Sequence, residues 1–363
     1  MKVKIIGAGS IGNHLGHAAR SLDWNVTIVD IDPLALKRTK ETIYPSRYGI
    51  WDNKIKLKLS DEEPKGGFDL ICIGTPPDSH IKLALKALNE KPNAILIEKP
   101  LTSPDLVGCQ ELFEKSKYLS IPVFVGYDHA VSRSINKLKD EINKTNPDEF
   151  LTLDVEFREH WGGIFSAHPW LSGPKDSYLG FTKRGGGASG EHSHALHLWQ
   201  SIAFFTNKGR VSSVQATMNF IKEGGLEYDS ITSLNLKTET GFFGRCIQDV
   251  ITNPPRKFLR LQGKYFGYEW ECNPIPEKDS IKIQKNDGSC TVEHITKKRP
   301  DDFITELKHI KNCIKSNIES PISLEKGLET MMVLTAANIA QSESRIVSID
   351  YSKGWKKEAF NCL

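Results

Sequence analysis

The stretch from Val3 to Gly12 reads Val-Lys-Ile-Ile-Gly-Ala-Gly-Ser-Ile-Gly. It joins a short apolar run, typical of a buried strand, to a G-x-G-x-x-G pattern that opens a helical pattern ending near Leu22. Such a turn needs a tight first glycine, a second glycine that admits a pyrophosphate to the backbone, and a third for close helix packing. A second apolar run ends in Asp30, about 20 residues after the glycines, where a carboxylate accepts hydrogen bonds from ribose hydroxyls. This order of strand, turn, helix, strand and acid predicts a dinucleotide-binding fold, and the alternative is a glycine turn that only lets a helix pack on a sheet.

The cofactor expected from this pattern is NAD. A carboxylate at Asp30 would face the 2′-phosphate of NADP and repel it. Lys37 and Arg38 follow on the next helical pattern, where we expect them to form a solvated face rather than a phosphate clamp.

The chain divides into two parts by its periodicity. Short apolar runs alternate with helical patterns in residues 1–126, which predicts a Rossmann-type doubly wound parallel sheet with strands at Val3 to Ile6, Asn25 to Asp30, Leu70 to Ile73, Ala94 to Ile97 and Val123 to Val125. Residues 127–363 are β-rich from Phe150 onward, with turn signals between the runs. The expected strands there form one antiparallel meander: Phe150 to Phe157, Val211 to Phe220, Ser230 to Leu236, Phe242 to Val250, Phe258 to Gln262, Gly267 to Glu271, Ile281 to Ile283 and Cys290 to Ile295. With helices predicted at Asp302 to Asn317 and Ser323 to Ser344, the second part is predicted to be an α+β domain with a mainly antiparallel sheet.

Composition excludes several classes of protein. The 363 residues carry 48 basic and 45 acidic side chains and are 39% hydrophobic, which excludes a disordered chain and gives no electrostatic case for a nucleic acid or an anionic membrane as partner. No apolar run reaches the roughly 18 residues of a membrane span, and the start of the chain lacks the apolar core of a signal peptide. The 7 cysteines are scattered without a C-x-x-C pair, which is typical of reduced thiols in a cytoplasmic protein.

Two further motifs follow later strands of the first part. Thr75-Pro76-Pro77-Asp78-Ser79-His80 comes after one apolar run, and Glu98-Lys99-Pro100 ends the next. Here the sequence resembles the glucose-fructose oxidoreductase, inositol dehydrogenase and rhizopine-catabolism family (Gfo/Idh/MocA), whose hallmark is T-P-x-x-x-H followed by E-K-P. The resemblance covers the whole cofactor domain, includes Gly126-Tyr127, and continues weakly to the closing helices. It implies substrate held between a nucleotide domain and an open-sheet domain.

Lys99 is the central residue that this resemblance implies. In the family the lysine of E-K-P lies beside the nicotinamide and the reacting hydroxyl, and Lys99 also follows a buried parallel strand at its carboxyl end, where ligands bind in such sheets. The cofactor-binding residues expected on the two grounds are Gly7, Gly9, Ser10, Ile11, Gly12, Asp30, Gly74, Thr75, Pro76, His80, Glu98 and Lys99.

The second landmark is the segment from Arg184 to Trp199. Family members have D-x-x-x-H on a helix after a glycine-rich turn, and His194 matches the histidine, but Gly190 stands at the Asp position. Either the register slips by one residue and Glu191 replaces the Asp, or that role is missing. His194, with an unperturbed pKa near 6.5, is the predicted base, so the predicted catalytic residues are Lys99, His194 and Glu191.

The three histidines of this segment also raise the possibility of a metal. At about 100° per residue on one helix, His192 points some 160° away from His194, whereas His194 and His197 share a face. Only two of the three could share an ion, so we expect no metal. A hydrogen-bonded core histidine is the alternative for His194 and, more strongly, for His197.

Residues 160–190 form a long stretch without regular pattern but rich in aromatic side chains. Flat rings suit the apolar faces of sugars, and cations suit a carboxylate or phosphate. A hydrophobic cluster that pins the loop is an equally strong alternative. The expected substrate-binding residues are Lys99, Tyr127, Trp161, Trp170, Arg184, His194 and His197.

These observations predict an NAD-dependent oxidoreductase that transfers hydride between the nicotinamide and a secondary alcohol of a sugar, polyol or nucleotide sugar. One alternative is a glycoside hydrolase or lyase that oxidises its substrate transiently and returns the hydride. The other is a non-catalytic regulator that binds NAD. We expect a homodimer or homotetramer formed through the carboxy-terminal sheet.

Overall fold

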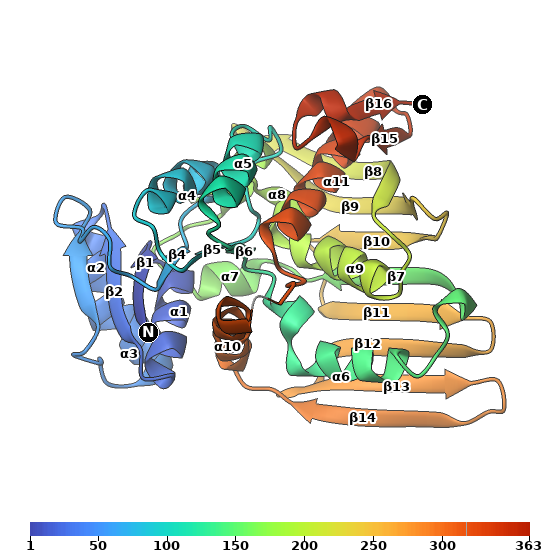
Figure 1. Cartoon of the computed structure of the whole chain (residues 1–363), viewed down its shortest axis with the longest axis horizontal. Helices are drawn as coiled ribbons and strands as arrows, with labels where there is room; N and C mark the ends of the chain where they lie inside the picture. Colours follow the sequence, from blue (N-terminus) through green and yellow to red (C-terminus); the bar gives the residue numbers. More distant parts are fainter. Residues whose placement is uncertain (317) are drawn as a thin grey trace.

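Two β-sheets organise the chain in the computed structural model, which describes residues 1–316 and 318–363 (Figure 1). The first is 6-stranded, has the order β3-β2-β1-β4-β5-β6, and is parallel throughout. Its strands are β1 (Lys2–Ile6), β2 (Asn25–Asp30), β3 (Lys56–Leu59), β4 (Leu70–Ile73), β5 (Ala94–Ile97) and β6 (Val123–Val125). The helices that accompany it are α1 (Ser10–Ser21), α2 (Pro33–Arg38), α3 (Tyr44–Tyr48), α4 (His80–Leu88) and α5 (Cys109–Leu119). This is the doubly wound Rossmann arrangement that the sequence predicts.

Burial explains why these strands are recognisable in the sequence. All residues of β4 and β5 are buried, because helices cover both faces of a parallel sheet, and such strands have continuous apolar sequences. The strand β3 was not predicted. It lies at the edge of the sheet and alternates lysine and leucine, so its burial is only partial.

The second sheet is 10-stranded, with the order β14-β13-β12-β11-β7-β10-β9-β8-β15-β16. Its strands are β7 (Phe150–Arg158), β8 (Val211–Glu223), β9 (Leu226–Thr238), β10 (Phe243–Asp249), β11 (Arg256–Gly263), β12 (Phe266–Ile275), β13 (Lys278–Lys285), β14 (Cys290–Thr296), β15 (Val347–Ile349) and β16 (Phe360–Cys362). The predicted single meander is wrong at β7, which lies between β10 and β11 and pairs in parallel with β10. A parallel neighbour requires a crossover, and the long connection with its helices after β7 supplies it. The two short strands at the carboxyl end of the chain were also not predicted.

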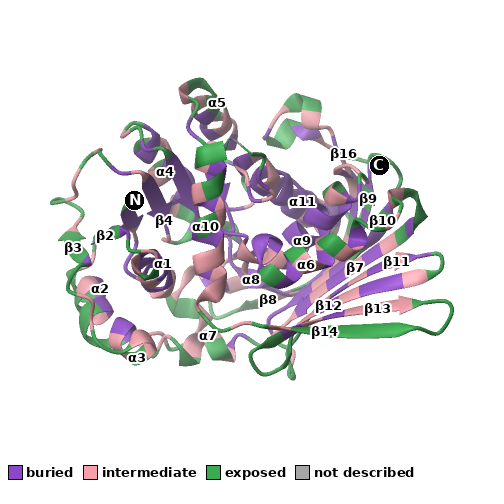
Figure 2. Cartoon of the chain, turned by 60° about the horizontal axis from the view of Figure 1, so that its bottom comes forward, coloured by how far each residue is buried: buried purple, intermediate pink, exposed green. Residues whose placement is uncertain are grey.

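Helices cover one face of the second sheet (Figure 1). They are α6 (Arg133–Ile142), α9 (Ser193–Phe205) and α11 (Leu324–Glu343), which pack on β12, β7 and β8 respectively. The shorter α7 (Gly162–Ser166) and α8 (Gly187–Glu191) belong to the stretch that lacked a regular pattern. At the open edge, most of β14 is exposed (Figure 2).

The helix α10 (Asp301–Ser316) joins the two parts of the molecule. It follows β14 but packs against α1 of the parallel sheet, where Phe303 stacks on His14 with ring centroids 4.9 Å apart. The predicted helix from Asp302 to Asn317 therefore exists, although Asn317 itself lies outside the described residues. In the described ranges, no helix combines the length and apolar character needed to cross a membrane.

Candidate active site

The glycine turn between β1 and α1 permits a close approach to its backbone. Gly7 has φ of +108°, and a Cβ atom there would meet the backbone oxygen of Gly74 at 2.6 Å. Gly12 also has no room for a side chain, because its Cβ would collide with the carbonyl oxygen of Gly7. In contrast, nothing lies within 4 Å of the Cβ position of Gly9. The turn is therefore open at the glycine over which a pyrophosphate is expected to lie.

Asp30 is held at the mouth of this turn. Its carboxylate accepts a hydrogen bond from the Ala8 backbone N–H at 2.7 Å and another from the Asp32 backbone N–H at 2.8 Å. Each carboxylate oxygen has further acceptor capacity. The carboxylate is thus oriented beside the turn and remains able to accept from a ribose diol.

Positive charge gathers at the start of α1. The Arg47 guanidinium donates a hydrogen bond to Ser10 Oγ at 2.8 Å and lies 3.3 Å from His14 Nε2. Burial, followed by the charges of Arg299 and Arg47, lowers the pKa of His14 to about 3. Two guanidinium groups near one glycine turn suit the negative charges of a pyrophosphate. The sequence analysis missed both arginines, because neither lies in a recognisable motif.

The turn after β4 packs against the glycine turn that follows the neighbouring strand β1. Ile11 packs beside Gly74, with its Cγ2 atom 3.5 Å from the Cβ position of that glycine. His80 is fully buried, and its ring nitrogens face the carbonyl oxygens of Thr75 at 2.6 Å and Pro100 at 3.0 Å. The ring therefore links the turn after β4 to the loop after β5, and the contact of His80 with the cofactor stays a prediction.

Glu98 and Lys99 differ in their surroundings although they are neighbours. Glu98 is buried against Gly126, and burial, followed by the charge of Asp128, raises its pKa to about 8. Its predicted contact with the cofactor is not available to a side chain in that position. The Lys99 ammonium donates to the backbone oxygen of Glu191 at 2.7 Å and lies 3.1 Å from Glu191 Oε2.

Gly190 explains why the acid of this segment is Glu191. A Cβ atom on Gly190 would collide with the carbonyl oxygen of Gly185, so no aspartate fits there. The next residue supplies the carboxylate that reaches Lys99. The structure thus favours the one-residue register shift over the loss of the acid.

The histidine segment is not one helix as expected. α8 ends at Glu191 and α9 begins at Ser193, so His192 lies at the break. His192 faces the backbone oxygen of Glu159 at 3.4 Å, whereas His194 Nδ1 lies 3.6 Å from Asp128 Oδ1. Burial is the largest cause that holds the pKa of His194 well below its usual range.

Sequence comparison identifies the first part of the chain. Residues 1–127 match the Gfo/Idh/MocA family model, an oxidoreductase family with an NAD-binding Rossmann fold. This first part of the chain is therefore similar to the nucleotide-binding domain of that family. The cofactor is accordingly NAD, which agrees with the open glycine turn, the oriented Asp30 carboxylate and the arginines beside α1. No curated protein sequence matches the chain.

Solved structures share the fold over nearly the whole chain. An oxidoreductase from Agrobacterium radiobacter, in complex with NAD+, L-tartaric acid and magnesium, is 18% identical with a TM-score of 0.73 and covers 96% of this chain and 98% of its own. The WlbA dehydrogenase from Bordetella pertussis, in complex with NADH and UDP-GlcNAcA, is 18% identical with a TM-score of 0.71 over 96% and 98% of the two chains. A putative myo-inositol dehydrogenase from Sinorhizobium meliloti is 20% identical with a TM-score of 0.72 over 96% and 99%. At these identities the likeness shows the fold, including the open-sheet domain.

Two predicted substrate residues, Tyr127 and His197, are buried in the structure. Tyr127 is fully buried and stacks on His197 at a centroid distance of 4.0 Å. His197 Nε2 faces the Pro321 backbone oxygen at 2.9 Å, as the core-histidine alternative requires. Neither side chain is placed to contact a substrate, but Tyr127 supports His194, which packs against its edge at 5.7 Å.

The aromatic residues of the irregular stretch are distributed over two places. Trp161 is 7% exposed and forms a small hydrophobic cluster with Leu179, Ala188 and Val250, so the cluster alternative is correct for this residue. Trp170 instead lies under the Arg38 guanidinium, which is 5.5 Å from its ring centroid.

Arg38 also pairs with Asp32, directly after the strand that ends in Asp30. Arg38 therefore connects Trp170 with the segment that follows β2, and the sugar contact of Trp170 stays a prediction. Arg184 pairs with Asp78 at 2.6 Å and thereby links this stretch to the turn after β4.

Proposed function

We propose that this protein is an NAD-dependent dehydrogenase that oxidises a secondary alcohol of a sugar, polyol or nucleotide sugar, or catalyses the reverse reduction. The contact of Lys99 with Glu191 is the observation that carries this proposal. It places an ammonium and a carboxylate together at the carboxyl end of β5, two strands from the glycine turn. A dinucleotide extended from that turn would bring its nicotinamide to this edge of the sheet.

The residues divide the chemistry between them. When bound, the nicotinamide accepts a hydride at its C4 atom from the carbinol carbon. Lys99 would donate a hydrogen bond to the hydroxyl oxygen and stabilise the negative charge that develops there. Glu191, whose carboxylate lies 3.1 Å from the ammonium, would take the proton of the hydroxyl. His194 turns its Nδ1 atom toward Asp128. We therefore propose that His194 lines the pocket for the substrate oxygen. This differs from the role predicted from the sequence, in which His194 removes the proton.

The structurally similar proteins support the proposed substrate class. The related structures include one with a nucleotide sugar and one described as a putative inositol dehydrogenase. A hydroxyl-rich substrate also suits a site lined by charged groups of both signs, since each hydroxyl can donate to a carboxylate and accept from an ammonium.

A substrate screen tests the proposal. Purified protein is incubated with NAD and a panel of sugars, polyols and nucleotide sugars, and NADH formation is followed by its absorbance, with Lys99→Met as the matched control. We expect at least one substrate to give NADH with the wild type and not with the variant. Cleavage of a glycosidic bond without net NADH would establish the hydrolase or lyase alternative, and NAD binding without turnover of any compound would favour a regulator.

We also propose that the chain assembles with itself through the uncovered face and edge of the second sheet. Apolar side chains lie exposed there, including Leu151, Phe243 and Val292, which are 50%, 57% and 53% exposed. Sedimentation equilibrium should show a dimer or tetramer, and Phe243→Glu should shift it toward the monomer. A monomeric wild type would refute the proposal.

A further inference from the structure

Three side-chain atoms converge beside the Lys99 site without being hydrogen-bonded. They are Asp128 Oδ1, His129 Nδ1 and His194 Nδ1, and the three residues offer one ligand atom each within 4.8 Å of one another. The separation from Asp128 Oδ1 to His194 Nδ1 is 3.6 Å, which is too long for a good hydrogen bond. Each of the three atoms is shielded from solvent and has no hydrogen-bond partner among the described residues. Buried polar atoms are nearly always satisfied, so three unsatisfied atoms in one place indicate a missing ligand.

The fold holds these three side chains in position. Asp128 and His129 are consecutive at the start of the short helix Asp128–Val131, directly after β6, and His194 lies in the first turn of α9. The His129 ring packs edge-on against Phe157 at 5.2 Å and against His194 at 4.9 Å. Packing on both sides fixes the ring orientations, so the convergence is a property of the core and not of mobile surface groups.

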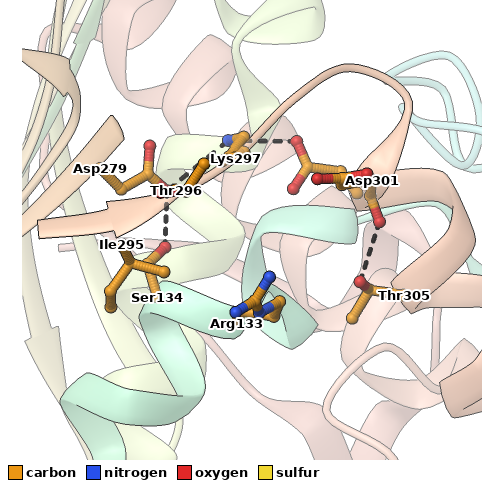
Figure 3. Close-up of a pocket in the computed structure, with 9 residues that line it drawn as sticks. Arg133, Ser134, Asp279, Ile295, Thr296, Lys297, Asp301 and Thr305 are labelled. Carbon is orange, nitrogen blue, oxygen red and sulfur yellow. Dashed lines mark hydrogen bonds and ion pairs between the residues drawn. The ribbon is translucent and has the colours of Figure 1, made fainter. Parts of the chain in front are cut away.

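Two further buried carboxyl groups lie near these three residues. Glu306 is fully buried with neither oxygen hydrogen-bonded in the described part of the chain, and Glu98 is 6% exposed with one oxygen in the same state. Lys297 and Lys99, two lysines in this region, already form ion pairs with other carboxylates. Lys297 lies 3.7 Å from Asp279 and 3.1 Å from Asp302, and it lines a small pocket together with Asp279 (Figure 3). Lys99 contacts Glu191. Asp128 Oδ1 itself is buried without a hydrogen-bond partner among the described residues, which is costly, and a bound cation would satisfy it.

We infer that Asp128, His129 and His194 bind one divalent transition-metal ion, for which Zn²⁺ is the best match. Two imidazole nitrogens and one carboxylate oxygen favour Zn²⁺ over Mg²⁺ or Ca²⁺, which prefer oxygen ligands. In a tetrahedral zinc site, bonds of about 2.0 to 2.2 Å separate the ligand atoms by roughly 3.3 to 3.6 Å. The 3.6 Å separation between Asp128 Oδ1 and His194 Nδ1 matches the upper end of that range, so this pair needs to move little. The ligand atom of His129 lies within 4.8 Å of both, so its side chain would move closer when the ion binds. Three protein ligands leave a fourth position open, as in catalytic zinc sites.

The position of the ion gives it a role in the proposed reaction, and this role rests on the proposed function. His194 comes three residues after Glu191, whose carboxylate contacts Lys99. An oxygen of the substrate in the open position would be acidified by the ion, while Glu191 takes the proton and the hydride passes to the nicotinamide. The ion keeps its oxidation state throughout, so alcohol and NAD are converted to carbonyl compound, NADH and one proton. The expectation of no metal came from considering only the histidines of one segment, and the two new ligands come from a distant loop.

Metal binding can be tested without substrate or turnover. The full chain is stripped with a chelator, passed through a desalting column, incubated with Zn²⁺ or Co²⁺, desalted again, and analysed for bound metal by mass spectrometry and for Co²⁺ by visible absorption. We expect one ion per chain in the wild type. The double variant Asp128→Asn, His129→Gln should lose at least tenfold in affinity, whereas His192→Gln and His309→Gln should bind as the wild type does. Circular dichroism and NAD affinity show whether each variant is folded.

The outcomes separate this inference from the proposed function. Absence of stoichiometric Zn²⁺ and Co²⁺ from the folded wild type would overturn the metal site and leave the dehydrogenase proposal intact. Equal binding by the folded double variant, or loss of binding in His192→Gln alone, would overturn the ligand assignment. Stoichiometric metal bound by these three residues, in a protein that oxidises no alcohol, would confirm the site and refute the reaction.

Discussion

The Lys99 ammonium is held by both the side chain and the backbone of Glu191, at 3.1 Å from Oε2 and 2.7 Å from the carbonyl oxygen. Lys99 follows a strand of the parallel sheet, whereas Glu191 ends α8, which packs on the second sheet. One ion pair therefore joins the two halves of the molecule at the proposed site of reaction. Its geometry exists only when both halves are folded and docked.

Replacing Lys99 by Met should lower kcat by roughly 10² to 10⁴, the range that acid-base groups contribute. Affinity for NAD, measured by calorimetry, should remain near the wild-type value, because the lysine acts on the hydroxyl. Turnover close to that of the wild type would remove Lys99 from the mechanism.

Replacing Glu191 by Gln keeps the backbone contact to Lys99 but removes the proton acceptor. We expect kcat to fall by roughly 10² or more with little change in KM for the alcohol. Glu239→Gln is the matched control, because Glu239 pairs with Arg210 at 3.1 Å on the surface. If both variants behave alike, the proton does not leave through Glu191.

Asp30 should determine the preference for NAD over NADP. Its carboxylate is held by the Ala8 and Asp32 backbone N–H groups beside the glycine turn, where it would repel a 2′-phosphate. Asp30→Ala should narrow the ratio of kcat/KM values for the two cofactors, and Arg38 is the nearby cation able to meet the phosphate. A wild type that prefers NADP would contradict this assignment.

Arg47 should contribute to cofactor binding rather than to chemistry. It contacts Ser10 Oγ in the glycine turn, and a lost charge-assisted hydrogen bond costs about 1.5 to 3 kcal/mol. Arg47→Ala should therefore raise KM for NAD by roughly 10-fold to 100-fold with kcat little changed, whereas the exposed Arg345→Ala should have no effect. An unchanged KM in the Arg47 variant would show that the pyrophosphate lies elsewhere.

Lys139 should make stability depend on pH in the alkaline range. It lines a cavity of about 390 Å³, and burial lowers its pKa from 10.5 to about 8. The other charged and titratable groups of the cavity are His197, His309, Glu319, Lys326 and Glu329. Between pH 8 and 10.5 the unfolded chain holds the Lys139 proton more tightly than the folded chain, so the contribution of this group to stability rises with pH.

Lys139→Met should accordingly raise the Tm near pH 7, and this advantage over the wild type should shrink as the pH is raised toward 10. Scanning calorimetry of the two proteins at both pH values measures the difference in Tm between them. The contributions of the other titratable groups cancel in this difference, because both proteins contain them. A difference in Tm that does not change with pH would show that the lysine is not destabilised by burial.

The boundaries of four strands, β2, β4, β5 and β6, were predicted to the residue, because each is a continuous apolar run bounded by a turn. The places of Gly9 in an open turn and of Lys99 after β5 were also predictable from motifs whose residues are close in sequence. The neighbours of β7 in the sheet could not be predicted in this way, since the partner of a strand depends on which distant segments fold next to it. Its parallel pairing with β10 leaves no local trace in the sequence.

Composition and local pattern by themselves determined the class of fold, the nucleotide turn and the lysine at the end of β5, because strand period, glycine geometry and a motif after a strand act over a few residues. Tertiary packing decided which of the predicted site residues are buried and which are brought together. Tyr127 and Trp161 have the aromatic character expected of a sugar platform, yet tertiary packing places both in the interior. The same packing brings Asp128 and His129 against His194 across more than sixty residues, and forms a candidate metal site that no single segment contains.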